Sequence, residues 1–122
     1  MSYDLRLAVK VDGAEDCYAV VAMPEYHSPT YNIGEMFRKC MGWNFIQGEW
    51  YRVSDVLPNI KRGIWELSQN ESEYTQYNST NGWGTVKSAL KALESLLECI
   101  EAQCGNGWSW NDIPPECLYV AW

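Results

Sequence analysis

Apolar and polar residues alternate at both ends of the chain. From Leu5 to Val11 every second residue is a leucine or a valine, which is the pattern of a β-strand with one buried face. Turn residues follow, and residues 17–23 form a second, more continuously apolar segment. These two segments predict an antiparallel hairpin. Residues 118–122 alternate in the same way, so we expect the end of the chain to join this hairpin as a further strand.

Three other segments carry apolar residues at steps of three and four, the spacing of amphipathic helices. The clearest is residues 85–105, which we expect to pack against the sheet as its main helix. A second helix is expected over residues 54–67. A third, shorter helix over residues 32–42 should end at Gly42, because glycine readily adopts the positive φ found at helix C-termini.

The segments between these helices are rich in polar, glycine or aromatic residues. Asn32 and Ser54 are the expected N-caps, because their side chains can accept hydrogen bonds from the first free amides of a helix. Residues 43–53 predict a second short hairpin or an extended loop. Residues 71–83 and residues 105–115 predict loops.

The pattern as a whole predicts an α+β fold, in which a small antiparallel sheet of the N-terminal hairpin plus the C-terminal strand packs against about three helices. The 122 residues suit one core, so we expect residues 1–122 to form a single globular domain. An apolar fraction of 47% and a charged fraction of 20% are typical of folded proteins. Neither a long apolar segment nor an N-terminal secretion signal is present, so we expect a cytoplasmic protein that does not associate with membranes.

Charge is unevenly distributed along the chain. The net charge of −7 disfavours direct binding to nucleic acid or to an anionic membrane surface. From residue 94 to residue 122 there are five acidic residues and no lysine or arginine. Three of these acids, Glu94, Glu98 and Glu101, recur at helical spacing. They form a predicted acidic face that would bind a partner.

No catalytic or metal-binding arrangement stands out in the sequence. His27, the sole histidine, lies between prolines in an expected loop, with no nucleophile indicated beside it. The five cysteines are scattered and lack the two tight pairs of a structural zinc site, so we expect free thiols in a reducing cytosol. We therefore expect no enzyme activity, no metal and no cofactor. The stretch NGWGT before the longest helix leaves open a small anionic ligand at a helix N-terminus.

Aromatic residues are the remaining signal, with 7 Trp, 8 Tyr and 2 Phe. Phe37 falls on the apolar side of its predicted helix and should lie in the core. Many of the others stand in expected loops or beside glycine and asparagine, as aromatic residues do on surfaces that bind proteins or stack on bases. The candidate residues for binding a ligand or partner are Tyr31, Trp43, Trp50, Arg52, Trp83 and Trp108.

Four stretches, DLRLAVKVDG, YNIGEMFRKCMGWNF, NGWGT and PPECLYVAW, resemble those of small accessory proteins carried by phages and prophages of Gram-positive, gut-type bacteria. The resemblance covers nearly the full chain and implies a setting, the cytoplasm of a bacterial host, but no site residues. By analogy it favours stoichiometric binding to a host protein, as an inhibitor of a defence system of the anti-CRISPR type. The acidic face would then compete for the basic groove of a nucleic-acid-binding defence enzyme.

A second hypothesis is a sponge for a small molecule. A pocket lined by four of the tryptophans, with an arginine to pair an anionic group, would capture a nucleotide-like signal without converting it. Nucleotides would then quench the tryptophan fluorescence. The sequence also leaves open a homodimer formed through Trp122 and other exposed apolar residues. The pocket residues in this hypothesis are Trp43, Trp50, Trp83, Trp108 and either Arg38 or Arg52.

Overall fold

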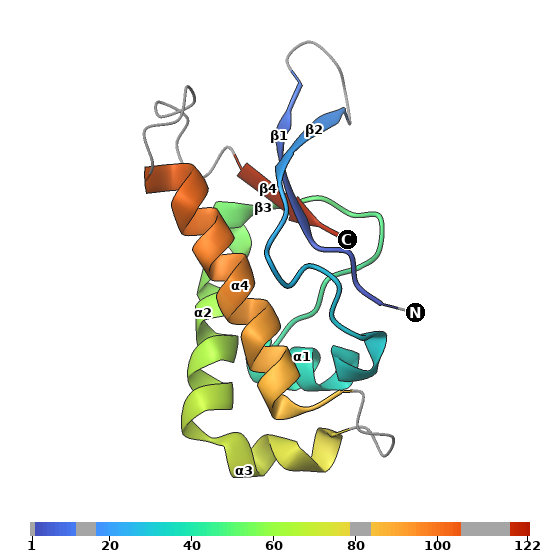
Figure 1. The fold of residues 1–122 in the computed structure, drawn as a ribbon, viewed down its shortest axis with the longest axis vertical. Helices are drawn as coiled ribbons and strands as arrows, with labels where there is room; N and C mark the ends of the chain where they lie inside the picture. The colour runs from blue at the N-terminus through green and yellow to red at the C-terminus, as the bar shows by residue number, and fades with distance from the viewer. Residues whose placement is uncertain (1, 12–16, 79–83, 106–117) are drawn as a thin grey trace.

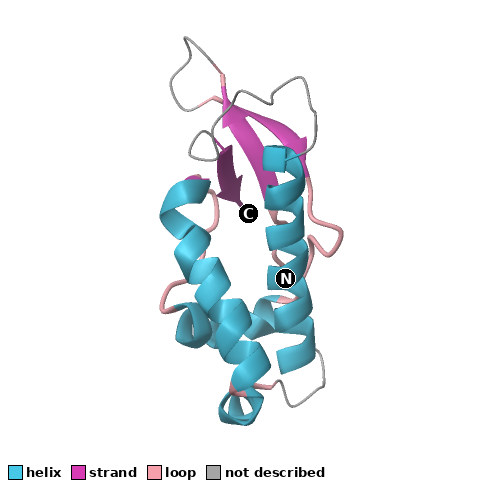
Figure 2. Cartoon of the chain, turned by 90° about the vertical axis from the view of Figure 1, so that its left-hand side faces the viewer, coloured by secondary structure: helices cyan, strands magenta, loops and turns pink. Residues whose placement is uncertain are grey.

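The computed structural model describes residues 2–11, 17–78, 84–105 and 118–122 (Figure 1). These residues form a four-stranded antiparallel sheet with the strand order β2-β1-β4-β3, and helices that pack beside it. Figure 2 shows the strands gathered toward one end of the molecule and the helices along the rest of it. The strands are β1 (Arg6–Lys10), β2 (Tyr18–Ala22), β3 (Tyr51–Arg52) and β4 (Leu118–Ala121).

The sheet confirms the predicted α+β class, the N-terminal hairpin and the C-terminal strand. β1 pairs on one side with β2 and on the other with β4, so strands from both ends of the chain lie at the centre. Leu7 is paired with Val120, and both side chains are fully buried. Val11, predicted to continue the buried face, is 40% exposed because it lies beyond the end of β1.

Residues 43–53 do not form a second hairpin. Their loop turns at Gly48, which has a φ of 84° and donates a hydrogen bond from its amide to the Trp122 carbonyl at 2.9 Å. The chain then enters β3, where Tyr51 is paired with Val120 of β4. The partner of β3 therefore comes from the far end of the chain, which no local pattern can indicate.

The three predicted helices are present, and α1 ends at Gly42 with the expected positive φ, 73°. In residues 71–78, predicted as part of a loop, the chain forms two short helical turns instead. Tyr74 is buried there, so the packing of its ring holds these turns against the rest of the protein. The helical elements are η1 (Tyr31–Ile33), α1 (Gly34–Met41), α2 (Val53–Gln69), α3 (Glu71–Tyr74), η2 (Thr75–Tyr77) and α4 (Val86–Gly105).

The two predicted N-caps are wrong. Asn32 lies inside η1, and Ile33 occupies the cap position of α1. Helix α2 begins at Val53 directly after β3, so Ser54 falls within its first turn. Neither helix start has a side-chain cap hydrogen bond. A 3-10 turn and a strand run straight into these helices, so the cap positions fall on Ile33 and Arg52, whose side chains carry no hydrogen-bond acceptor for the first amides.

The helices approach one another closely at Gly63. A Cβ atom at this position would lie 2.7 Å from Met41 Cγ of α1 and 2.8 Å from Leu93 Cδ1 of α4. Non-bonded carbon atoms do not come so close, so glycine is the residue that fits between these two side chains. A glycine that lowers the helix propensity of α2 is therefore what lets three helices share one core.

Helix α4 packs chiefly against α2 rather than against the sheet, which corrects the expectation from its pattern. Figure 1 shows the two helices side by side along the molecule. The helix with closer contacts to the sheet is α2, through β3 and β4. Because α2 follows β3 without a loop, it is held against this edge of the sheet and takes the place that the pattern of α4 suggested.

Trp122 is part of the core. Its side chain is 7% exposed, and its ring centroid lies 4.6 Å from that of Tyr3. Phe37, placed in the core by its spacing, packs on the same tyrosine with a centroid distance of 5.4 Å. Trp122 is therefore a core residue rather than one of the exposed apolar residues that the homodimer hypothesis assumed. Within the described residues, none of the helices combines the length and the apolar character needed to cross a bilayer.

Candidate functional site

The outer face of α4 carries charges of both signs. Glu94, Glu98 and Glu101 are exposed along it. The structure also places Lys87 and Lys91 there, nearer the N-terminus of the helix, and both line the same groove as Glu94 and Glu98. The face is therefore basic in its N-terminal half and acidic in its C-terminal half. The four groove residues Lys87, Lys91, Glu94 and Glu98 are called the α4 charged face below.

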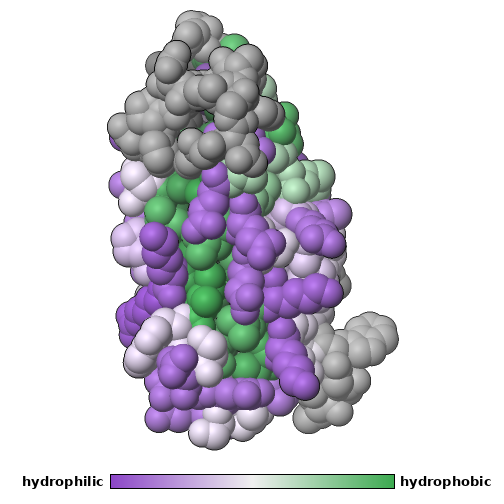
Figure 3. Space-filling view, turned by 60° about the vertical axis from the view of Figure 1, so that its left-hand side comes forward, coloured by the Kyte–Doolittle hydropathy of each residue, from purple (hydrophilic) through white to green (hydrophobic). Residues whose placement is uncertain are grey.

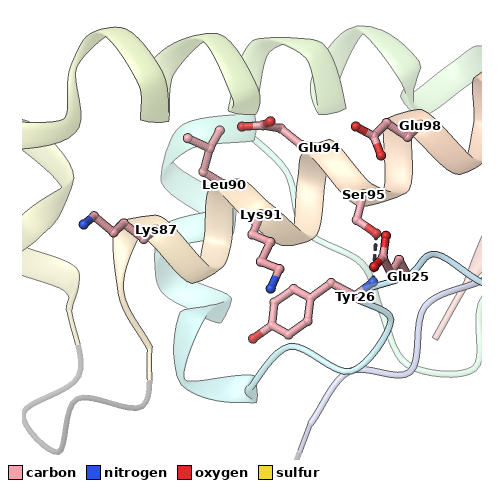
Figure 4. Close-up of a pocket in the computed structure, with 8 residues that line it drawn as sticks. All are labelled: Glu25, Tyr26, Lys87, Leu90, Lys91, Glu94, Ser95 and Glu98. Atoms are coloured by element: carbon pink, nitrogen blue, oxygen red, sulfur yellow. Dashed lines mark hydrogen bonds between the residues drawn. The ribbon is translucent and has the colours of Figure 1, made fainter.

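A shallow groove of about 300 Å³ runs along this face. Its second wall is the loop after β2, which contributes Glu25 and Tyr26 (Figure 4). Two contacts fix the loop to α4. The Tyr26 amide donates a hydrogen bond to Ser95 Oγ at 2.8 Å, and Lys91 Nζ lies 5.1 Å from the Tyr26 ring centroid. Leu90 adds an apolar side chain to the groove and points toward α2.

The charges of the α4 charged face are arranged against the stability of the helix that carries them. Acids near the N-terminus and bases near the C-terminus stabilise a helix, whereas α4 has no acid in its first turn and no base in its last turn. Side chains four residues apart carry like charges, Lys87 with Lys91 and Glu94 with Glu98, and these two unfavourable pairs outnumber the one opposite-sign pair within the face, Lys91 with Glu94. In the part of the chain that the structure describes, none of these four side chains forms a salt bridge.

A line of apolar surface follows the side of the molecule where α2 and α4 lie. Figure 3 shows it as a green stripe between polar ridges. It is narrow and flanked by charged side chains, which is typical of the rim of a core rather than of a separate binding pocket. The partly buried apolar residues of these two helices that pack against the core include Leu57, Ile64, Leu90 and Leu97.

The edge of the sheet at β2 is apolar and exposed. Val20, within β2, is 51% exposed, and Val11 and Met23, beside the strand ends, are 40% and 45% exposed. β2 contains no charged residue and no proline, and the described residues place β1 on one side of it and no strand on the other. Edge strands usually carry charges or prolines that prevent pairing with another chain. The continuous apolar run of residues 17–23 was a signal for this edge, but it equally fits a buried strand.

Trp43 belongs to an inner aromatic cluster. Its ring makes edge contacts with Phe45 and Tyr51, at centroid distances of 4.7 and 4.8 Å. Tyr51 is paired with Val120, which lies on the buried face of the sheet. Trp43 is partly exposed, but its contacts extend the core.

Trp50 lies on the opposite face of the sheet. Its ring stacks on Tyr18 at 4.6 Å, and the Arg6 guanidinium carbon lies 5.5 Å from the centroid of the Trp50 ring. Tyr119 makes an edge contact with Tyr18 at 5.0 Å. The exposed Arg52 is opposite Tyr119 in the strand register and therefore shares this face. Tyr18, Trp50 and Tyr119, together with Arg6, are called the outer aromatic face below.

Of the four tryptophans expected to line one pocket, the two that the structure describes are not neighbours. Trp43 and Trp50 are on opposite faces of the sheet, as their ring contacts show. Trp83 and Trp108 lie outside the described residues, as does most of the NGWGT stretch. Tyr31 belongs to η1, but its side chain is also outside the described part.

Burial makes two ionisable groups of the core poor candidates for chemistry. It raises the pKa of the Cys40 thiol to about 12. Burial and the neighbouring Glu66, which accepts a hydrogen bond from the Tyr74 hydroxyl at 3.2 Å, raise the pKa of Tyr74 to about 12. His27 Nδ1 lies 3.2 Å from the Pro24 carbonyl oxygen. Among the described residues, no three His, Cys, Asp or Glu side chains are grouped closely enough to hold a metal ion.

The described residues define an α+β protein whose exposed features are a charged helix face, an apolar sheet edge and an outer aromatic face. Comparison with protein-family models, with curated proteins and with solved structures gave no match. Support for the protein's function therefore comes from these surfaces themselves.

Proposed function

We propose that the protein acts by stoichiometric binding of another protein, as an inhibitor, and that the β2 edge is its docking site. The observation that supports this is the exposed apolar strand, in which Val20 is 51% exposed and no charge is present. An extended segment of the partner would add to the sheet beside β2. Main-chain hydrogen bonds would supply affinity, and the side chains of Val11, Val20 and Met23 would supply apolar contact.

The net charge and the resemblance to phage accessory proteins suggest the kind of partner. A net charge of −7 attracts a basic surface, such as the nucleic-acid groove of an enzyme. That resemblance favours, as the partner in this proposal, a defence enzyme in the cytoplasm of a bacterial host, of the kind that anti-CRISPR proteins inhibit. The exposed Glu101, outside the α4 charged face, would add to the attraction.

The test compares Val20→Lys with Ile46→Lys. Both side chains are exposed, at 51% and 59%, and both variants add one positive charge. Ile46 is the matched control because its amide is bonded to Tyr51 of β3, at the other edge of the sheet. A host protein captured by the wild type, identified and then tested in purified form, should bind Val20→Lys at least about tenfold more weakly and Ile46→Lys equally well. Equal binding by both variants would contradict the proposal.

A second candidate function is the capture of a nucleotide-like signal at the outer aromatic face. The observation in its favour is the Arg6 guanidinium, 5.5 Å from the Trp50 ring and beside the stacked Tyr18. Aromatic rings can stack on a base while a nearby cation pairs a phosphate.

Nucleotide titrations that follow tryptophan fluorescence test this second candidate. Quenching should occur in the wild type and in Trp65→Phe, since Trp65 is exposed on α2 away from the strands. It should be lost in Trp50→Phe. A wild type that nucleotides do not quench, or equal quenching in both variants, would contradict this function.

A further inference from the structure

The α4 charged face is self-complementary. The face consists of Lys87, Lys91, Glu94 and Glu98, which are spaced by four, three and four residues. The spacing is the same in both directions along the helix, and each positive charge has a negative charge at the equivalent position from the other end. We propose that this face binds the same face of a second copy of the chain, with the two α4 helices antiparallel. The inference goes beyond the proposed function, because it concerns a different surface and an identical partner.

A two-fold axis through the middle of the face matches opposite charges. With a rise of about 1.5 Å per residue, Lys91 and Glu94 each lie about 2 Å from the midpoint along the helix, and Lys87 and Glu98 each lie about 8 Å from it. Rotation about the axis sets Lys87 opposite Glu98 of the second copy. It also sets Lys91 opposite Glu94 of the second copy. Each pair occurs twice in such an isologous contact, and no like charges meet at the same level.

The state of the face in a single chain favours a second copy over an unrelated partner. Its four charged side chains form no salt bridge among the described residues, and like charges lie one turn apart along the helix. The antiparallel contact offsets both, and it also sets the two helix dipoles in opposition. An unrelated partner would require complementary charges but no symmetry within this face. The symmetry of the spacing is therefore the feature that points to an identical copy.

The groove supplies the less polar part of the contact. Leu90 lies in it, and the Tyr26 ring lies against the Lys91 side chain. Its volume of about 300 Å³ can accept side chains of the facing helix. The 20 residues of α4 give a contact about 30 Å long. One polar helix pair buries less area than a standard protein interface, so the dimer is reversible and weakens as salt rises.

Paired charge reversals test the contact with internal controls. Lys87→Glu with Lys91→Glu makes the whole face acidic, and Glu94→Lys with Glu98→Lys makes it basic. Each double variant should self-associate at least about tenfold more weakly than the wild type, because attractive pairs become repulsive. An equimolar mixture of the two should form a heterodimer, since their faces are opposite in charge.

The fourfold variant, in which both pairs are exchanged, is the matched control. It keeps the self-complementary order, so it should dimerise by itself as the wild type does, but it should not pair with the wild type. Sedimentation velocity at low salt over a range of concentrations measures all of these species. Circular dichroism of each variant verifies that it is folded.

Two results would overturn the proposal. One is a wild-type chain that stays at its single mass of 14.0 kDa at every concentration in low salt. The other is a dimer that persists in both double variants, because self-association would then use another surface. Val20→Lys separates this proposal from the proposed function, since it should leave the dimer intact while it weakens binding of the host partner. A dimer lost in Val20→Lys but kept in the charge variants would assign self-association to the β2 edge and overturn the role of α4.

Discussion

On its inner face α4 presents Ala89, Leu93 and Leu96 at helical spacing, and all three are fully buried. On its outer face the same helix presents exposed charges, with Lys87 opposing the dipole in the first turn and two like-charge pairs four residues apart. On the inner face the spacing, burial and packing of the residues all stabilise the fold. On the outer face the arrangement of the charges is unfavourable for the stability of the helix. If the sequence of α4 served only the stability of the fold, the residues of both faces would stabilise the helix. The unfavourable charges therefore indicate that the outer face has another role.

The sheet shows a related contrast between its central strand and its edge. β1 is paired on both sides, and its Leu7 and Ala8 are fully buried. β2 is an edge strand that exposes Val20 and carries none of the charges that normally protect such an edge. In both elements, the departure from the rule that stabilises the element locates a candidate binding surface.

Truncation of a fully buried leucine and of a half-buried leucine of α4 is expected to give the largest difference in the free energy of unfolding. Leu93→Ala removes a fully buried side chain and should lower the free energy of unfolding by about 2–5 kcal/mol. Leu90→Ala, at a half-buried position less than one turn away, should lower it markedly less. Urea denaturation followed by circular dichroism measures both variants. Similar losses would mean that the half-buried flank of α4 beside α2 contributes to the core as much as the inner side does.

The next largest effect concerns the contact of three helices at Gly63. Helix propensity alone predicts that Gly63→Ala stabilises α2 by about 1 kcal/mol. The new Cβ atom would, however, lie 2.7 Å from Met41 Cγ and 2.8 Å from Leu93 Cδ1. We expect overpacking to dominate, with a net loss of about 1–3 kcal/mol in the free energy of unfolding. Lys61→Ala, exposed on the same helix, is the control, and a Gly63→Ala variant more stable than this control would show that the helices can separate at little cost.

Elements whose own periodicity determines them could be predicted from the sequence. The alternation of Leu5 and Leu7 placed β1, and the apolar stripe of α4 placed that helix, because each pattern matches the face that becomes buried. Features that depend on distant partners could not be predicted. The pairing of Tyr51 with Val120, the packing of α4 on α2 and the buried Tyr74 of α3 all join segments whose contact no local pattern encodes.

The residues of the candidate surfaces also divide into those that local periodicity could place and those that it could not. Helical spacing was enough to put Glu94 and Glu98 on one exposed face. The same spacing places Lys87 and Lys91 on that face, and it becomes informative once the structure shows that all four line one groove. The faces of the loop tryptophans could not be predicted, because a loop has no period that relates its side chains to the sheet.

Ionisation of a buried thiol should change the free energy of unfolding by a smaller amount, and this change distinguishes a buried cysteine from an exposed one. Burial raises the pKa of Cys40 from 9.0 to about 12, so the folded state keeps the thiol protonated while the unfolded chain ionises. Stability is therefore complete below about pH 9 and falls as the pH rises toward 12. At pH 9.5, Cys40 alone should lower the free energy of unfolding by about 1 kcal/mol relative to pH 7. Urea denaturation at several pH values measures this slope, which Cys40→Ala should flatten and the exposed Cys17→Ala should leave unchanged.

The smallest expected effect tests whether the outer charges of α4 serve its own stability. Exchanging Lys87 and Lys91 for Glu, and Glu94 and Glu98 for Lys, places acids toward the N-terminus of the helix and bases toward its C-terminus. Like-charge spacing among the four positions is the same in both chains. Position 87, in the first turn, becomes acidic and position 98 becomes basic, one turn before Glu101, while the contact of Lys91 with the Tyr26 ring is lost. The net result should be a rise of about 0.5 kcal/mol in the free energy of unfolding at low salt. Denaturation in dilute samples, where association is negligible, measures this gain, which 1 M salt should remove. A fourfold variant less stable than the wild type would show that the native order of charges stabilises the isolated chain. The outer face of α4 would then stabilise the fold as the inner face does, and the contrast between them would disappear.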